Sequence, residues 1–137
     1  MTNLLSPSLT EAVATTLLDR CFLLTDPNQP DNPIIYVSEG FLRHTGYSRE
    51  EVIGRNCRFL QGPGTDPSVR AAVREAVAAH REIAVRILNY RKNGEPFLNL
   101  LRIRPAFDRD GKLEAIIGVQ HPEPGGAELA QEVLRSG

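Results

Sequence analysis

The second half of the sequence holds three strand-like stretches separated by two strong turn signals. The stretches cover residues 82–91, 96–107 and 112–120, and the pairs Asn93-Gly94 and Asp110-Gly111 stand between them. Asn-Gly and Asp-Gly pairs tolerate positive φ angles and are typical of the tight turns that join antiparallel strands. This part of the chain is therefore predicted to form consecutive hairpins of an antiparallel sheet.

The first half adds two short strands and several helices. Apolar, β-rich residues predict strands at 21–25 and 34–37, which flank a loop (residues 26–33) with three prolines. Short helical pieces follow in 38–62, and a longer helix is expected over 67–80, with Asp66 as its N-cap. Amphipathic helices are also expected near both termini, at 8–19 and 127–134.

These elements predict an α+β fold, in which a five-stranded antiparallel sheet is covered on one face by short helices and carries N- and C-terminal helical extensions. We divide the chain into an N-terminal helical extension (1–20), a central domain (21–122) and a C-terminal linker with a short helix (123–137). A cavity suited to a small molecule is expected between the sheet and the helices.

Composition narrows the class of protein. The 137 residues suit one domain, 41% are hydrophobic, and the formal net charge of -1 predicts no direct binding to nucleic acid or anionic membranes. No membrane-spanning run or secretory signal is recognisable. Two cysteines, Cys21 and Cys57, without a CxxC pair favour a reduced, cytoplasmic location, and no spacing suggests a metal site.

Three carboxamides are predicted to face the cavity. Strand alternation places Asn89, Asn99 and Gln120 among apolar side chains, and closure of the hairpin around residues 93–95 would put Asn89 opposite Asn99. The amides could satisfy one another or face water. The alternative is a planar ligand with donors and acceptors along its edge, such as a flavin ring. Gly118 would give such a ring room, although a bulge or bend would also explain this glycine.

Arginines and a cysteine form a second group of candidates. Arg58, Arg70 and Arg74 could be a solvated helix face or an anion clamp, because guanidinium groups match phosphate oxygens. Cys57 has arginines beside it, which favours a reactive thiolate, yet a lone cysteine is most often a small buried hydrophobe. No histidine can be placed beside Cys57 from the sequence, which disfavours a cysteine hydrolase. Cys21 is expected in the core.

The ten residues from Gly54 to Pro63, GRNCRFLQGP, resemble the signature of LOV (light-oxygen-voltage) domains, the flavin-binding blue-light sensors of the PAS superfamily. The segment NYRKNG at residues 89–94 resembles the central hairpin of the family, and residues 118–120 resemble its last strand. The resemblance extends with nearly unbroken spacing over residues 21–120. It implies a PAS fold and a bound flavin, FMN in preference to riboflavin or FAD.

The resemblance also implies a role for each matching residue. Cys57 corresponds to the photoactive thiol, which forms a reversible bond to flavin carbon C4a in blue light and releases it in the dark. Asn56 and Gln61 match residues along the ribityl and phosphate chain, and Arg58, Arg70 and Arg74 match phosphate ligands. Asn89 and Asn99 match the pair at the pyrimidine edge, and Gln120 matches the glutamine near flavin N5. The residues expected to line the ring pocket are Thr25, Leu60, Leu101, Ile103 and Gly118.

A domain of this kind is expected to be a switch and not an enzyme, because nothing turns over. No output domain is recognisable, as in the bacterial short LOV proteins, so we expect the signal to pass from Gln120 to the terminal helices. We also expect a homodimer through these helices and an effector protein acting in trans. Two alternatives remain: a thiol redox sensor at Cys57, and a PAS interaction module without photochemistry. Leu98, where many plant members have tryptophan, is expected to face away from the pocket.

Overall fold

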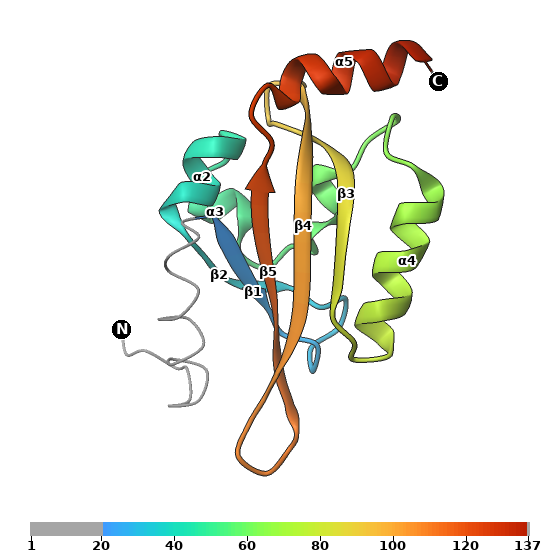
Figure 1. The fold of residues 1–137 in the computed structure, drawn as a ribbon. Helices are drawn as coiled ribbons and strands as arrows, with labels where there is room; N and C mark the ends of the chain where they lie inside the picture. The colour runs from blue at the N-terminus through green and yellow to red at the C-terminus, as the bar shows by residue number, and fades with distance from the viewer. Residues whose placement is uncertain (1–20, 137) are drawn as a thin grey trace.

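The computed structural model describes residues 21–136 and contains one antiparallel sheet with the strand order β2-β1-β5-β4-β3. The early strand β1 is an interior strand of the sheet because it pairs with both β2 and the last strand β5 (Figure 1). The strands are β1 (Phe22–Thr25), β2 (Ile34–Val37), β3 (Ile83–Tyr90), β4 (Pro96–Phe107) and β5 (Leu113–Pro122). The predicted five-stranded antiparallel sheet is therefore confirmed.

The helices between β2 and β3 begin and end at recognisable capping residues. Ser38 caps α2, Ser48 and Glu51 form a capping box on α3, and Asp66 caps α4, where Pro67 takes the first position. The helices are α2 (Glu39–Thr45), α3 (Arg49–Val52), the 3-10 helix η2 (Cys57–Leu60), α4 (Pro67–Ala78) and α5 (Gly126–Ser136). The helix expected at 8–19 lies outside the described residues.

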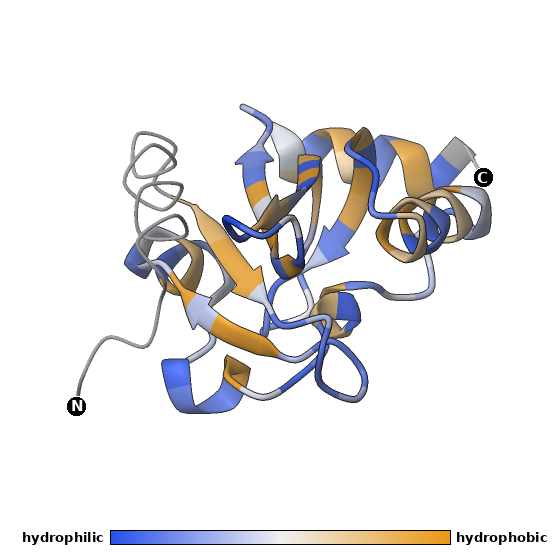
Figure 2. Ribbon diagram, turned by 90° about the horizontal axis from the view of Figure 1, so that it is seen from below, coloured by the Kyte–Doolittle hydropathy of each residue, from blue (hydrophilic) through white to orange (hydrophobic). Residues whose placement is uncertain are grey.

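Side chains pack on both faces of the sheet. The face that carries Leu23 packs with Phe41 and Val52 from α2 and α3, and the opposite face of β1 and β5 buries Phe22 and Ile117. Figure 2 shows that hydrophobic residues concentrate in the strands and along one side of the helices. The short helices α2, α3 and η2 therefore stand on one side of the sheet, and a cavity forms beneath them.

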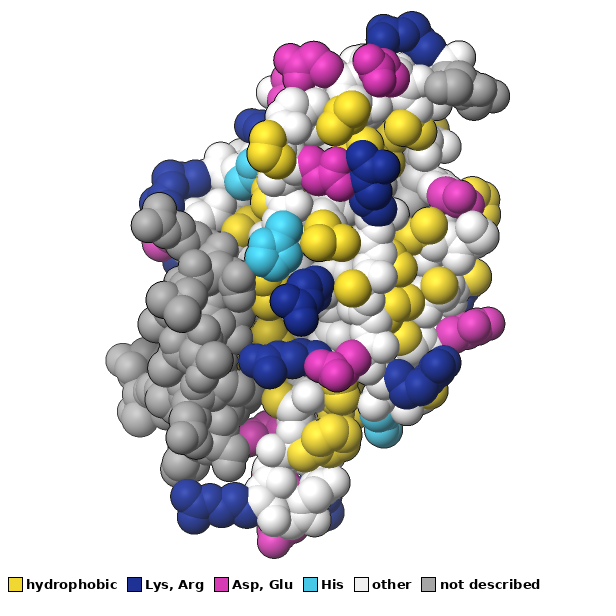
Figure 3. Space-filling view, in the orientation of Figure 1, with side chains coloured by type: hydrophobic (Ala, Val, Ile, Leu, Met, Phe, Trp, Pro, Cys, Tyr) yellow, Lys and Arg dark blue, Asp and Glu magenta, His cyan; other side chains and the backbone are white. Residues whose placement is uncertain are grey.

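The C-terminal helix α5 docks on the side of the sheet away from that cavity. Ala130 is completely buried in a cluster with Leu88 of β3 and Leu98 of β4. Strand alternation turns Leu98 away from Asn99, so Leu98 faces outward as predicted and is covered by α5. On the view of Figure 3, hydrophobic side chains alternate with both acidic and basic groups.

One predicted detail of the sheet is wrong. Asn89 pairs with Phe97 and Asn99 pairs with Ile87, so Asn89 and Asn99 are diagonal neighbours and not directly opposite one another. The turn closes between Arg91 and Gly94, where the Gly94 N–H donates to the Arg91 carbonyl at 2.9 Å. The hairpin is therefore centred one residue earlier than predicted. Diagonal neighbours on one face still lie within reach of amide side chains.

Candidate ligand-binding site

A pocket of about 570 Å³ lies between the sheet and the helices. This volume is typical of a site for a drug-sized or cofactor-sized molecule. Every residue predicted from the sequence as a site residue lines it, except Asn99, which is fully buried and bonds to the lining residues Asn89 and Gln120. The lining residues among the predicted ones are Thr25, Asn56, Cys57, Arg58, Leu60, Gln61, Arg70, Arg74, Asn89, Leu101, Ile103, Gly118 and Gln120.

One end of the pocket carries a network of buried amides. The Asn99 amide group donates to Asn89 Oδ1 at 3.1 Å and also to Gln120 Oε1. Asn89 in turn donates to the Leu60 carbonyl at 3.4 Å, which connects the network to η2. The amides therefore bond to one another, as one interpretation of the sequence expected. One acceptor atom of this network, Asn99 Oδ1, nevertheless has no hydrogen-bond partner.

Two polar atoms of predicted site residues have no hydrogen-bond partner. Asn99 Oδ1 belongs to the amide network, whereas Thr25 Oγ1 lies farther along the sheet, where Thr25 pairs with Ile116. Both side chains are almost fully covered. A buried polar group without a partner costs about 1–3 kcal/mol. Apolar residues, including Leu23, Ile87 and Ile116, form the walls next to these atoms. The arrangement fits a flat molecule with an apolar body and hydrogen-bonding atoms along one edge.

Gly118 lies in the wall beside β1. A Cβ atom placed there would lie 3.3 Å from Leu23 Cδ1, tighter than ordinary van der Waals contact. The pairing runs without a register shift from Gly118 to Ile103 on one side and to Leu23 on the other. A bulge therefore does not explain this glycine, and the interpretation that remains is close packing beside the pocket.

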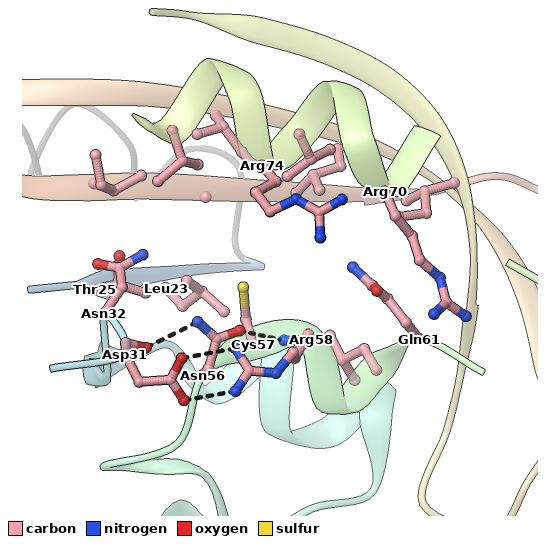
Figure 4. A pocket seen from close by; sticks show the side chains of 18 of the residues that line it. Leu23, Thr25, Asp31, Asn32, Asn56, Cys57, Arg58, Gln61, Arg70 and Arg74 are labelled. Atoms are coloured by element: carbon pink, nitrogen blue, oxygen red, sulfur yellow. Dashed lines mark hydrogen bonds and ion pairs between the residues drawn. The ribbon is translucent and has the colours of Figure 1, made fainter. Parts of the chain in front are cut away.

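The three candidate arginines differ in what they contact. Arg74 reaches from α4 into the pocket (Figure 4), and no polar partner is found for it within residues 21–136. Arg70 donates to the Gly62 carbonyl at 2.6 Å, and its guanidinium points away from Arg74. Arg58 is held in a forked ion pair with Asp31, with N–O distances of 2.8 and 2.6 Å. Arg74 is thus the cation best placed for an anionic group of a ligand.

The proline-rich loop 26–33 forms part of the rim of the pocket. Its residues Pro27, Gln29, Asp31 and Asn32 line the pocket, and none of them was singled out from the sequence. Asp31 and Asn32 have φ angles of 65° and 48°, a conformation that Asp and Asn tolerate better than most residues. The Asp31 carbonyl accepts from Asn56 Nδ2 at 2.9 Å. The side-chain hydrogen bond from Arg58 lowers the pKa of Asp31.

Cys57 begins η2, and its sulfur points into the pocket (Figure 4). Asn56 caps this short helix by accepting the Arg58 N–H at 2.9 Å. Burial raises the pKa of the Cys57 thiol, and the nearby Arg58 acts in the opposite direction. The net shift favours the neutral thiol over the thiolate that a peroxide sensor requires. Cys21 is buried in the core, and burial raises its pKa to about 12.

Within residues 21–136, the side chains of a cysteine hydrolase or of a metal site are not brought together. The three histidines, His44, His80 and His121, are absent from the pocket lining, so no described histidine stands beside Cys57 as a base. Within the described residues, no cluster of three or more His, Cys, Asp or Glu side chains could hold a metal ion. No helix in residues 21–136 is long and apolar enough to cross a membrane.

Comparison with known proteins identifies the family. The PAS domain profile matches residues 19–121. The light-state structure of the Aureochrome1 LOV domain, described as a blue-light photoreceptor, superimposes with a TM-score of 0.77 at 39% identity, covering 90% of this chain and 94% of that one. The chain is a LOV domain. It belongs to the PAS family, and the resemblance noted in the sequence is confirmed.

The LOV domain also matches parts of longer proteins. It is 49% identical to Phototropin-2 of Oryza sativa subsp. japonica, over 82% of this chain and 13% of that protein. It is 50% identical to Blue-light-activated histidine kinase 1 of Erythrobacter litoralis, over 71% of this chain and 27% of that protein. The chain thus spans less than a third of these relatives, and the comparison concerns their sensor segment. LOV relatives imply a flavin as the chromophore and a role in signalling.

Proposed function

We propose that this LOV domain senses blue light through a reversible bond between the Cys57 sulfur and a bound flavin, with FMN as the cofactor. The observation that carries the proposal is a thiol that points into a mostly apolar pocket, with a network of buried amides at one end that leaves Asn99 Oδ1 without a partner. A structural cysteine would have no need of such a pocket. A catalytic one would need a base, and no described histidine supplies it.

We assign the pocket residues to the parts of FMN as follows. The amides of Asn89 and Asn99, with the unsatisfied Asn99 Oδ1, suit the donor and acceptor edge of the pyrimidine ring, and Thr25 would line the ring pocket. Apolar side chains and Gly118 suit the faces of the ring system. Arg74 suits the phosphate, and we assign the pocket residues Asn56 and Gln61 to the sugar chain. FMN would supply the absorption of blue light and the ring carbon with which the sulfur bonds.

Cys57 and Gln120 would perform the two steps that belong to the protein. Cys57 would supply both the sulfur and the proton, and both would return to it in the dark, so no other reactant is required. Gln120 Oε1 accepts from Asn99, which fixes the present orientation of its amide. Gln120 would turn its amide if the group beside it changed from acceptor to donor, because an unsatisfied buried group costs about 1–3 kcal/mol.

The output we propose is a change in the packing of the terminal helices. Gln120 lies on β5, and α5 follows this strand after a short connection. An 11-residue helix such as α5 is too short to be stable alone, so its docking can respond to small changes in free energy. We further propose a homodimer through the terminal helices, an effector protein acting in trans, and a cytoplasmic location for the two free thiols.

Substitution of the two cysteines tests the proposal. Cys57→Ala protein should remain yellow, fluoresce more strongly and lose reversible bleaching in blue light. Cys21→Ala is the matched control, because Cys21 is a buried thiol outside the pocket lining, and this variant should still bleach and recover. A Cys57→Ala protein that bleaches and recovers like the native one would overturn the proposal. A native protein that stays colourless with added FMN would favour the redox or interaction alternatives.

A further inference from the structure

The residues Gln61–Thr65, called loop 61–65 below, connect the photoactive helix to both α4 and the edge of the sheet. Gln61 is the C-cap of η2, the short helix that begins with Cys57, and its N–H donates to the Arg58 carbonyl at 2.9 Å. Asp66, the N-cap of α4, follows the loop directly. A displacement of η2 therefore has to pass into loop 61–65.

Hydrogen bonds fix this loop from three directions. Thr65 Oγ1 donates to the Leu88 carbonyl at 2.6 Å and accepts the Gly62 N–H at 3.1 Å. Arg70 donates to the Gly62 carbonyl at 2.6 Å. The Gly64 N–H donates to Tyr90 Oη at 3.0 Å. The loop is thus attached to the end of β3, to the first turns of α4 and to the ring of Tyr90.

The two glycines of the loop, Gly62 and Gly64, pack so closely against their neighbours that a side chain would not fit at either position. A Cβ atom on Gly62 would lie 2.6 Å from Cδ1 of the Tyr90 ring, and a Cβ atom on Gly64 would overlap the Leu134 side chain. Leu134 belongs to the last turn of α5, and Figure 1 shows α5 crossing the end of the sheet toward this loop. Helix α5 therefore touches the loop that continues the Cys57 helix, in addition to its contact with the sheet.

Three consecutive residues of β3 join the pocket to this contact. Asn89 faces the pocket and donates to the Leu60 carbonyl in η2. Leu88 and Tyr90 point the other way, where Leu88 packs in the cluster that includes Ala130 of α5 and Tyr90 packs against it. The same strand end thus contacts the amide network, loop 61–65 and α5.

We propose that loop 61–65 couples the position of the Cys57 helix to the docking of α5, with Leu134 as the contact on α5 and Tyr90 as the residue that positions the loop. The light-driven step of this coupling rests on the proposed function. Close-packed contacts transmit small shifts because their neighbours have no room to absorb them. Leu134 is 38% exposed, whereas Leu88, the contact of the loop on β3, is only 4% exposed, so we expect the contact with Leu134 to change more readily. This route would run in parallel with the route through Gln120.

Hydrogen exchange of the α5 amides, measured in the dark and under blue light, tests the coupling. Native protein should exchange faster in α5 under light. Leu134→Ala should raise exchange in the dark by about 5–30-fold, as expected for a loss of one or two kcal/mol, and should remove most of the light–dark difference. Val133→Ala is the matched control: it truncates a neighbouring exposed apolar residue that is not among the nearest neighbours of Gly64, and it should keep that difference.

A further variant, Tyr90→Phe, and a further measurement, the dark recovery rate, provide independent tests of the coupling. Tyr90→Phe removes only the acceptor of the Gly64 N–H, so the Gly64 amide should exchange faster already in the dark. By the reciprocity of coupled sites, Leu134→Ala should also change the dark recovery rate at Cys57, and Val133→Ala should not.

Three results would overturn the coupling: α5 exchange that light does not alter in a native protein that bleaches, equal effects of the two α5 variants, or a Gly64 amide unaffected by Tyr90→Phe. Failure of the proposed function would show itself separately, as native protein that does not bleach.

Discussion

Replacement of Arg74 by alanine should weaken the binding of FMN far more than the binding of riboflavin. Arg74 extends from α4 into the pocket and is free of polar partners within the described part of the chain. Riboflavin has the same ring and sugar chain as FMN and lacks only the phosphate. The ratio of the two affinities therefore isolates the contribution of the phosphate site.

The size of the effect follows from the contacts. A hydrogen bond to a charged group contributes about 1.5–3 kcal/mol, and each 1.4 kcal/mol is a factor of ten in Kd. Arg74→Ala should thus raise the Kd of FMN by about 10–150-fold and change that of riboflavin by less than about threefold. Arg58→Ala should have a smaller effect, because the carboxylate of Asp31 already neutralises this guanidinium at 2.6 Å. Arg70→Ala should fall between them, because Arg70 must leave the Gly62 carbonyl to reach a phosphate.

Titration of the flavin-free protein with each flavin, followed by quenching of flavin fluorescence, gives the four sets of affinities. The account predicts the order Arg74, Arg70, Arg58 for the loss of FMN preference. Equal losses of FMN and riboflavin in Arg74→Ala would show that this arginine supports the fold and not the phosphate. An unchanged FMN affinity would refute the assignment outright.

Three further predictions test other parts of the pocket. Asn99→Leu removes both donations to Asn89 and Gln120, so the binding of FMN and of riboflavin should weaken together, by about 5–150-fold for the loss of roughly 1–3 kcal/mol, in the same fluorescence titration. Gly118→Ala should lower the free energy of unfolding by about 1 kcal/mol in urea, because the new methyl group crowds Leu23; a more stable variant would contradict the close packing described here. Asp31→Asn should be less stable than native protein at pH 7, and the difference should disappear in acid. The pKa of Asp31 is lowered by Arg58, so its ion pair stabilises the fold above the unfolded-state pKa and is lost as the pH falls through the folded-state pKa. A difference that persists in acid would show that the ion pair is not its source.

The parts of the fold that follow from local sequence were predicted well. Turn pairs and alternating apolar residues located the strands, and β2 and β4 have the predicted bounds, 34–37 and 96–107. Asp66 and Pro67 marked the start of α4 for stereochemical reasons that do not depend on the rest of the molecule. The register of the β3–β4 hairpin was missed by two residues. The pair Asn93-Gly94 indicates a turn but does not determine which turn position Gly94 occupies. In the structure, Gly94 is the last residue of the turn.

Contacts between distant segments were beyond the sequence pattern. The ion pair between Arg58 and Asp31 joins residues 27 positions apart, and it assigns to Arg58 a partner that no local rule predicts. Asp31 and Asn32 line the pocket because the loop adopts positive φ angles at both residues. The prolines of this loop indicated irregular structure and did not indicate its course. The contact of Leu134 with Gly64 depends on where α5 docks. The sequence indicates that α5 is amphipathic, but the surface that α5 covers depends on packing against distant residues.

The absorption spectrum of the purified protein, recorded before, during and after a blue pulse, tests the central claim most directly. The account predicts a flavin band that bleaches in native protein and returns completely in the dark, with no bleaching when Cys57 is alanine. A flavin band that is indifferent to blue light in the native protein, or no flavin band after incubation with FMN, would contradict it.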